Sequence, residues 1–261
     1  MGLFEGRPWG RYHYGNLEHL DALLFAEERK LMAWMAANVY TGSGEIVDAG
    51  AFLGGSACCF ADGLVRNKTV AQKSGRIHSY DLFRKYEFTK ADLDSWQRLE
   101  DGQSSLSIYH NQLASNDHMV VSYPGDIMQR EWRGGDIELL MLDCSKTQAL
   151  NDHCMRAFFP ALVPGKSYVL HQDYAIKSGL FWIHNTMHML RDYFVLEVTS
   201  NFGGTTVFRN IKQITPAIIE KTIATQSQGI KENMREAAEY ALSIGEDKIF
   251  EAITNSAKHV K

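Results

Sequence analysis

The chain has 261 residues, of which 45% are hydrophobic and 22% charged, the proportions of a globular protein with a substantial core. The formal net charge of -4 gives no reason to expect nucleic acid or an anionic membrane as a partner. No apolar run approaches the roughly 20 residues of a membrane span. The N-terminus lacks the apolar core of a signal peptide, and the four cysteines form no CxxC pair. We therefore expect a soluble cytoplasmic protein.

The first predicted element is a helix that begins after Asn16, a residue type that can cap it, and runs to about Tyr40. Apolar residues recur in this stretch at helical spacing: Leu17, Leu20, Leu24, Leu31 and Met35.

Beyond residue 44, strand patterns alternate with helix patterns. The predicted strands are GEIVDAG (44–50), RIHSYDLF (76–83), HMVVSYPGD (118–126), IELLMLD (137–143) and KSYVLHQD (166–173). The predicted helices are GSACCFADGLVR (55–66), Phe88 to about Leu99, TQALNDHCMRAFFPAL (147–162) and KSGLFWIHNTMHMLRDYF (177–194). This alternation predicts an α/β fold with a largely parallel sheet and helices on both faces.

The last two predicted strands, 195–200 and 205–210, are separated only by NFGG. So short a connection makes them antiparallel neighbours, because a parallel crossover needs a dozen residues or more. The fold class is therefore a Rossmann-like, doubly wound, mostly parallel seven-stranded sheet with an antiparallel last strand.

The tail begins with Thr215 and Pro216, a good helix start, and is predicted to be helical with breaks near Gly229 and Gly245. It could pack on the sheet or form a contact in a homo-oligomer. We expect one domain over 1–261, with an N-terminal cap and helix (1–40), a cofactor-binding core (41–210) and a helical extension (211–261).

The strongest local motif is VDAGAFLGGSA, residues 47–57. A strand ends in Asp48, Gly50 and Gly54 flank a tight turn, and a helix opens near Ser56. Glycines let the backbone approach a ligand, and a helix N-terminus offers N–H groups to an anionic group. A plain strand-to-helix turn remains the structural alternative.

The second predicted strand contains Asp81 near its end, where open α/β sheets bind a ribose through its hydroxyls. A solvated aspartate at a strand end is the alternative. A nicotinamide dinucleotide fold prefers G-x-G-x-x-G, whereas this turn has an acid before the first glycine. An NAD-dependent oxidoreductase is therefore the less favoured reading.

In these features the sequence resembles the class I S-adenosylmethionine-dependent methyltransferases over about residues 40–210. The residues that carry the resemblance are Asp48, Ala49 and Gly50 through Gly54, then Asp81, PGDI (124–127), Asp143 and the terminal hairpin. The resemblance implies S-adenosylmethionine as cofactor, with the glycine turn, including Ser56, beside its methionine part. It also implies that Asp81 holds the ribose and that Asp126 contacts the adenine amino group.

A narrower stretch, residues 141–175, looks like the macrocin O-methyltransferase group, which modifies sugars of natural products. In that group an aspartate after the fourth strand and an Asp-Asp-Tyr after the fifth bind a divalent metal. Here Asp143 and Asp173 match the outer acids and Tyr174 is in place, but Gln172 replaces the middle acid. Whether Asp143, Gln172 and Asp173 bind Mg²⁺ is left open, since a neutral carbonyl weakens a site for a hard cation.

Methyl transfer needs an aligned hydroxyl and a group that accepts its proton. The candidate bases are Asp143, His171 and Asp173, although His171 could instead face a core position, since alternate strand residues face opposite sides. We expect an O-methyltransferase that acts on a hydroxyl of a small molecule, such as a sugar of a secondary metabolite or glycan. A catalytically inactive, methyltransferase-like binding or scaffold protein is the main alternative.

Overall fold

The computed structural model describes residues 2–13, 15–86, 91–177 and 179–260. The chain divides into two compact units, Met1–Arg130 (unit 1) and Glu131–Lys261 (unit 2). The expectation of a single methyltransferase domain with a cap and an extension stays a prediction.

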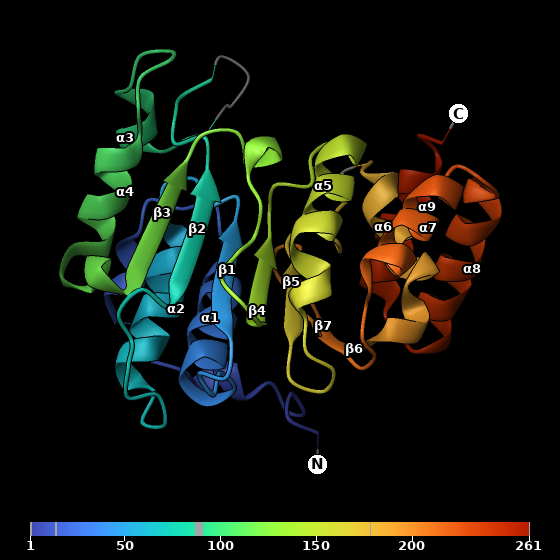
Figure 1. Cartoon of the computed structure of the whole chain (residues 1–261), viewed down its shortest axis with the longest axis horizontal. Helices are drawn as coiled ribbons and strands as arrows, with labels where there is room; N and C mark the ends of the chain where they lie inside the picture. The colour runs from blue at the N-terminus through green and yellow to red at the C-terminus, as the bar shows by residue number, and fades with distance from the viewer. Residues whose placement is uncertain (1, 14, 87–90, 178, 261) are drawn as a thin grey trace. The chain divides into compact units, whose positions relative to one another are not determined.

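The sheet of unit 1 is built from three parallel strands, β1 (Glu45–Ala49), β2 (Ile77–Asp81) and β3 (Val120–Pro124). Their arrows point the same way in Figure 1. Ile77 is paired with both Ile46 on β1 and Val120 on β3. Because the strands are parallel and in step, the loops that follow them leave the same edge of the sheet.

Unit 1 also contains the helices that connect and flank these strands. They are α1 (Ala26–Asn38), α2 (Gly55–Arg66), α3 (Asp94–Gln97) and α4 (Leu106–Leu113), with short 3-10 helices at Pro8–Arg11, Gly15–His19, Ala114–Met119 and Ile127–Gln129. The α1 and α2 helices approach very closely at Gly63, where an added Cβ would lie 2.2 Å from the Ala33 carbonyl oxygen. The N-terminus is held on α1 by an aromatic contact, since the rings of Trp9 and Trp34 lie 6.0 Å apart.

The long first helix predicted from Asn16 to Tyr40 is wrong in its first half, because α1 begins only at Ala26. The preceding backbone is organised by the Arg29 side chain. Its guanidinium donates to carbonyl oxygens that a helix would have used internally, namely those of Leu17, Glu18, Ala22 and Leu24. At the start of α1, the Glu28 carboxylate accepts from the Phe25 N–H at 3.0 Å.

The helix predicted from Phe88 to about Leu99 is much shorter than expected. Residues 88–90 lie outside the described part of the chain, and α3 covers only Asp94–Gln97. Trp96 and Leu99 pack into a buried cluster with Leu53 and Ala91, and Lys85 Nζ donates to the Leu99 carbonyl oxygen at 2.7 Å. These tertiary contacts end the helix where its periodicity alone would continue it.

Unit 2 contains β4 (Ile137–Leu142), β5 (Tyr168–His171), β6 (Phe194–Thr199) and β7 (Thr206–Asn210). The β4 and β5 strands are parallel, whereas β7 is antiparallel to both β5 and β6. The predicted terminal hairpin is thus confirmed. The strand order β3-β2-β1-β4-β5-β7-β6 also confirms the predicted mostly parallel, seven-stranded α/β sheet.

The helices of unit 2 follow the predicted positions. They are α5 (Gln148–Phe158), α6 (Phe181–Met189), α7 (Pro216–Thr225), α8 (Ile230–Ser243) and α9 (Asp247–Ala257), with 3-10 turns at Phe159–Ala161 and Arg191–Tyr193. The Thr215 hydroxyl caps α7 by accepting from the Ile218 N–H. The predicted breaks at Gly229 and Gly245 lie just before α8 and α9, and both glycines have a positive φ.

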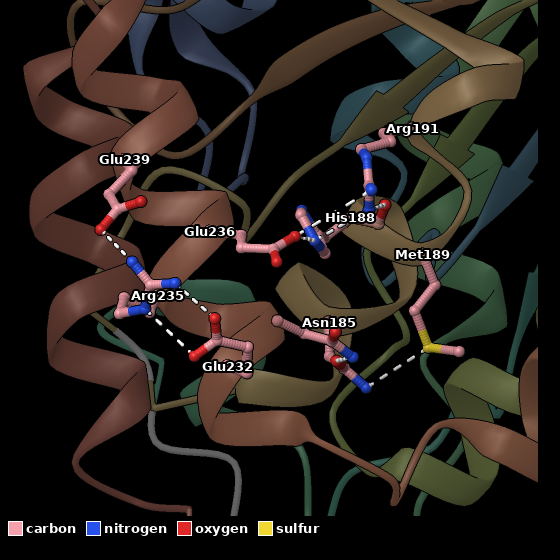
Figure 2. Close-up of polar contacts among 9 residues, drawn as sticks. Asn185, His188, Met189, Arg191, Glu232, Arg235, Glu236 and Glu239 are labelled. Atoms are coloured by element: carbon pink, nitrogen blue, oxygen red, sulfur yellow. Dashed lines mark hydrogen bonds and ion pairs between the residues drawn. The ribbon is translucent and has the colours of Figure 1, made fainter.

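Polar side chains join α6 to α8, as Figure 2 shows. His188 on α6 is 7% exposed and lies 3.1 Å from a Glu236 oxygen on α8. Asn185 on the same helix accepts a hydrogen bond from Asn233 at 2.9 Å. The C-terminal helices are therefore fixed to α6 through buried polar groups as well as apolar packing.

Among the described residues, no helix combines the length and the hydrophobicity that crossing a membrane requires.

Candidate functional site

The glycine turn after β1 has the conformation that its sequence predicts. Gly50 and Gly54 have φ values of 102° and 97°, in the region that favours glycine. The Gly54 N–H donates to the Ala51 carbonyl at 2.7 Å, and α2 begins at the next residue. A Cβ on Gly54 would lie 2.9 Å from the Tyr109 ring, so both the backbone conformation and the available space require glycine here.

A buried hydrogen bond between Asp48 and Ser56 stabilises this turn. The Ser56 hydroxyl lies 2.8 Å from both oxygens of the Asp48 carboxylate, and Ser79 on β2 donates to the same carboxylate at 3.4 Å. Asp48 and Ala49 are fully buried and Ser56 is 6% exposed. Their role in cofactor binding stays a prediction, and the geometry favours an indirect role in which they position the backbone of the turn.

Asp81 connects the turn to the end of β2. Its two carboxylate oxygens accept the backbone N–H groups of Phe52, at 3.0 Å, and Phe83, at 2.8 Å. Phe52 and Phe83 have positive φ values of 50° and 45°, a strained conformation for residues with a large side chain. Burial raises the pKa of Asp81, and the N–H groups that donate to it act in the opposite direction.

Asp126 lies in the loop after β3, next to the Asp81 loop. The Gly125 N–H donates to the Asp81 carbonyl oxygen at 3.0 Å. Asp126 is exposed, and one of its oxygens accepts the Met128 N–H at 2.9 Å. The structure therefore brings together, within unit 1, the glycine turn and the two acids that the sequence singled out.

Tyr86 is a further residue near the two acids, and no sequence pattern points to it. It is 37% exposed and lies close enough to Asp81 and Asp126 for both carboxylates to act on its hydroxyl electrostatically. Burial raises the pKa of Tyr86, the charge of Arg84 acts to lower it, and the two carboxylates act to raise it. Its loop position carries no periodic pattern and no motif, so only the folded chain reveals the proximity.

In unit 2, the carboxylates of Asp143 and Asp173 are both paired with one lysine, Lys146. Lys146 Nζ donates to Asp143 Oδ1 at 2.6 Å and also to Asp173 Oδ2. The side chains of Asp143, Asp173 and Lys146 are 29%, 13% and 52% exposed. Burial acts to lower the pKa of Lys146, but the attraction of both carboxylates outweighs it and raises that pKa above its ordinary value.

The loop that carries Lys146 is itself anchored. The Trp182 indole N–H, from α6, donates to the Ser145 carbonyl at 2.8 Å, and the Thr147 hydroxyl caps α5. Lys146 is thus held between two fixed residues. The D-x-x-K spacing of Asp143 and Lys146 is the signal from which sequence reasoning could have found it.

His171 and Gln172 are both buried, at 2% and 9% exposure. The Gln172 Oε1 accepts the Thr205 hydroxyl at 2.5 Å, and His171 Nδ1 has no hydrogen-bond partner among the described residues. Burial, then the nearby His184 and Lys146, lowers the pKa of His171 to about 3. His171 is therefore neutral over the working range of most enzymes, and a proton placed on it would be a buried charge beside the Lys146 ammonium.

The predicted metal ligands do not come together as an open donor set. Both carboxylates are paired with Lys146, and the Gln172 oxygen is bonded to Thr205. Within the part of the chain that the structure describes, no three His, Cys, Asp or Glu side chains form a cluster that could hold a metal ion. Mg²⁺ needs carboxylate and other oxygen atoms as ligands. Because these oxygens already bind Lys146 and Thr205, the arrangement does not fit Mg²⁺.

No family model matches the sequence, and neither does any curated protein. Solved structures do match the fold. The O-methyltransferase NovP is 12% identical, with a TM-score of 0.55 over 70% of this chain and 79% of NovP. CalS11, a TDP-rhamnose 3'-O-methyltransferase of calicheamicin biosynthesis, is 16% identical, with a TM-score of 0.53 over 74% of this chain and 83% of CalS11.

Identities this low establish the fold alone. The strand order, the antiparallel β7 and these two matches agree with the resemblance found in the sequence. The chain therefore has the class I methyltransferase fold, the fold of the S-adenosylmethionine-dependent O-methyltransferases to which it is similar.

Proposed function

We propose that the protein is an S-adenosylmethionine-dependent O-methyltransferase that methylates a hydroxyl group of a small molecule. The observation that carries the proposal is the Asp81 carboxylate, fixed at the end of β2 by the N–H groups of Phe52 and Phe83. This carboxylate lies beside the glycine turn, and helix α2 begins directly after that turn. A nucleoside cofactor needs this combination of a ribose acceptor and a close backbone approach.

The residues of unit 1 fit such a cofactor. The Asp81 oxygens accept the backbone N–H groups of Phe52 and Phe83, and the Leu82 N–H also acts on this carboxylate. A carboxylate has about four lone-pair sites, so it can still accept a ribose hydroxyl. Asp126 is exposed and can accept from the adenine amino group, and the Tyr86 hydroxyl lies near both acids. The glycine turn, including Gly50 and Gly54, would lie against the methionine part.

The bound cofactor would supply a methyl group activated on a positively charged sulfur. The chain must then align the acceptor oxygen and take its proton. The new bond is between that oxygen and the methyl carbon, the carbon–sulfur bond breaks, and its electron pair stays on sulfur. We assign the proton to a carboxylate of Asp143 or Asp173, since a proton there neutralises a charge whereas a proton on His171 creates a buried one.

One matched structure supports a proposal for the acceptor class. CalS11 is a TDP-rhamnose 3'-O-methyltransferase, and a sugar hydroxyl is a weak acid whose proton a general base must accept. We therefore propose a sugar hydroxyl of a natural product or glycan as the acceptor.

The test is calorimetric titration with S-adenosylhomocysteine and, separately, with NAD. We expect saturable binding of S-adenosylhomocysteine only; binding of NAD alone would instead support an oxidoreductase. Turnover is then measured with S-adenosylmethionine against a panel of glycosides and phenols. Asp143→Asn and Asp173→Asn should lower kcat by about 100-fold or more for whichever residue is the base, with little change in cofactor affinity.

A methyltransferase-like scaffold is the second candidate, because the two predicted catalytic acids are both tied to Lys146. Such a protein would bind S-adenosylhomocysteine and show no turnover with any acceptor of the panel. The two candidates therefore share the first measurement and differ in the second.

A further inference from the structure

The two acids that end the β4 and β5 region are bridged by one ammonium group. Lys146 Nζ donates to Asp143 Oδ1 at 2.6 Å and to Asp173 Oδ2. A lysine side chain that is ion-paired with two carboxylates carries a positive charge at neutral pH. The pair of acids therefore already has a permanent positive charge between them.

A divalent ion at the same two carboxylates would compete directly with this ammonium. Mg²⁺ and Lys146 would be like charges sharing one pair of partners, which is unfavourable. The third predicted ligand, Gln172, adds no negative charge, and its oxygen is bonded to Thr205. Lys146 already offsets half of the negative charge of the two acids, which leaves a net charge of only -1 to attract a divalent ion.

We propose that Lys146 takes the place of the divalent cation in this protein, so that its methyltransferase site works without a metal. This inference rests on the proposed function for its catalytic meaning, but not for its prediction about metal binding. Lys146 acts as a positioning residue for Asp143 and Asp173 and as a positive charge for the acceptor oxygen.

The bridge also limits how the acceptor is held. An ammonium has three N–H groups, and two of those on Lys146 are directed at the carboxylates. One donor remains, on a side chain that is 52% exposed, and one donor holds a single oxygen. A hexacoordinate ion would have several open positions and could chelate two neighbouring oxygens. The protein should therefore accept isolated hydroxyls as readily as vicinal diols.

The experiment measures Mn²⁺ binding by the loss of its free electron paramagnetic resonance signal, in wild type, Lys146→Met and the double variant Lys146→Met/Gln172→Asp. Lys166→Met, an exposed lysine of the same unit, is the matched control. We expect wild type and the control to bind no Mn²⁺ at about 1 mM, and the double variant, with three acids and no ammonium, to bind at least about tenfold more tightly. Mn²⁺ should raise the melting temperature of the double variant only, because binding to the folded state stabilises it.

The second part of the experiment measures methyltransferase activity. Wild-type turnover should be unchanged by a chelator or by added Mg²⁺, and Lys146→Met should lower kcat by about tenfold or more while Lys146→Arg, which keeps the charge, retains most of it. Tight Mn²⁺ binding by wild type, or loss of turnover with chelator and its return with Mg²⁺, would overturn the proposal. So would an unchanged kcat in a correctly folded Lys146→Met.

The two proposals can fail separately. If wild type binds no S-adenosylhomocysteine or shows no turnover, the proposed function fails, and the Mn²⁺ titration still decides whether Lys146 excludes the ion. That titration of wild type needs no variant, so a misfolded Lys146→Met does not prevent the test.

Discussion

The Asp81 carboxylate and the Phe52 backbone N–H lie 3.0 Å apart, across the 29 positions that separate them in the chain. This bond joins the end of β2 to the middle of the glycine turn. The Phe83 N–H occupies the other Asp81 oxygen at 2.8 Å, so one side chain holds two backbone segments with positive φ. A carboxylate that accepts two backbone N–H groups is well ordered before any ligand arrives, which reduces the entropy cost of binding.

The first prediction concerns this residue. Asp81→Ala leaves two N–H groups without their acceptor and should destabilise the fold by about 1–3 kcal/mol. Asp81→Asn keeps one acceptor oxygen, so it should be less destabilising but should still weaken S-adenosylhomocysteine binding by about tenfold or more. Calorimetry and urea unfolding measure the two effects. Asp101→Asn, at an exposed position, should change neither, and an unaltered affinity in Asp81→Asn would remove the assigned role.

The second prediction separates backbone strain from steric clash in the glycine turn. Gly54 and Gly102 have similar φ values, 97° and 81°. A Cβ on Gly54 meets the Tyr109 ring at 2.9 Å, whereas one on Gly102 meets nothing within 4 Å. Gly102→Ala should therefore cost only the left-handed strain of about 1–2 kcal/mol, and Gly54→Ala should cost clearly more and also impair cofactor binding. Equal losses of unfolding free energy in the two variants would contradict the steric argument.

The strands of the sheet could be predicted from the sequence because their patterns are local. Each is a short apolar run bounded by turn residues, and the four-residue link at NFGG allows only an antiparallel pair. The first helix could not be predicted in the same way. Leu17 and Leu24 have helical spacing, but the Arg29 side chain takes their carbonyl groups, and no local pattern reveals an interaction of that kind.

The third prediction uses the contacts of Figure 2 between α6 and α8. Asn185 is 2% exposed, donates to the Gln226 carbonyl at 2.9 Å and accepts from Asn233 at 2.9 Å. Asn185→Ala leaves both partners without this hydrogen bond and should cost about 2 kcal/mol or more. Glu232→Ala, which removes only an exposed pair with Arg235, should leave the urea midpoint unchanged. If the urea midpoint falls more in Glu232→Ala than in Asn185→Ala, burial of the hydrogen-bonded groups does not determine the loss of unfolding free energy.

The sequence predicts the two acidic residues of the candidate site in unit 2 but not the lysine that pairs with them. Asp143 directly follows β4 and Asp173 lies two residues beyond β5, the parallel neighbour of β4, so their proximity follows from the topology. Lys146 lies in a loop, three residues beyond Asp143. The orientation of its side chain depends on this loop, which the hydrogen bond from Trp182 to the Ser145 carbonyl fixes. Because that contact spans 37 positions, the sequence did not reveal the ammonium, and the family resemblance left open whether a metal lies there.

The last prediction concerns His184, which is fully buried and donates its Nε2–H to the Tyr174 carbonyl oxygen at 2.7 Å. Burial lowers the pKa of His184 to about 4, although the bond to Tyr174 acts to raise it. The unfolded chain, in which a histidine titrates near pH 6.5, therefore binds a proton at higher pH than the folded protein does. The contribution of His184 to stability is fully present above about pH 6.5 and is lost as the pH falls towards 4.

The unfolding free energy of the wild type should thus decrease on acidification, with a slope from this residue of up to about 1.4 kcal/mol per pH unit. His184→Gln cannot titrate, so its urea unfolding curves between pH 7.5 and 5 should show a flatter dependence, although it is less stable at pH 7.5. His259→Gln, at an exposed position of the same unit, should keep the wild-type slope. If His184→Gln keeps that slope as well, the pH dependence comes from other groups and the burial of a neutral His184 is not its cause.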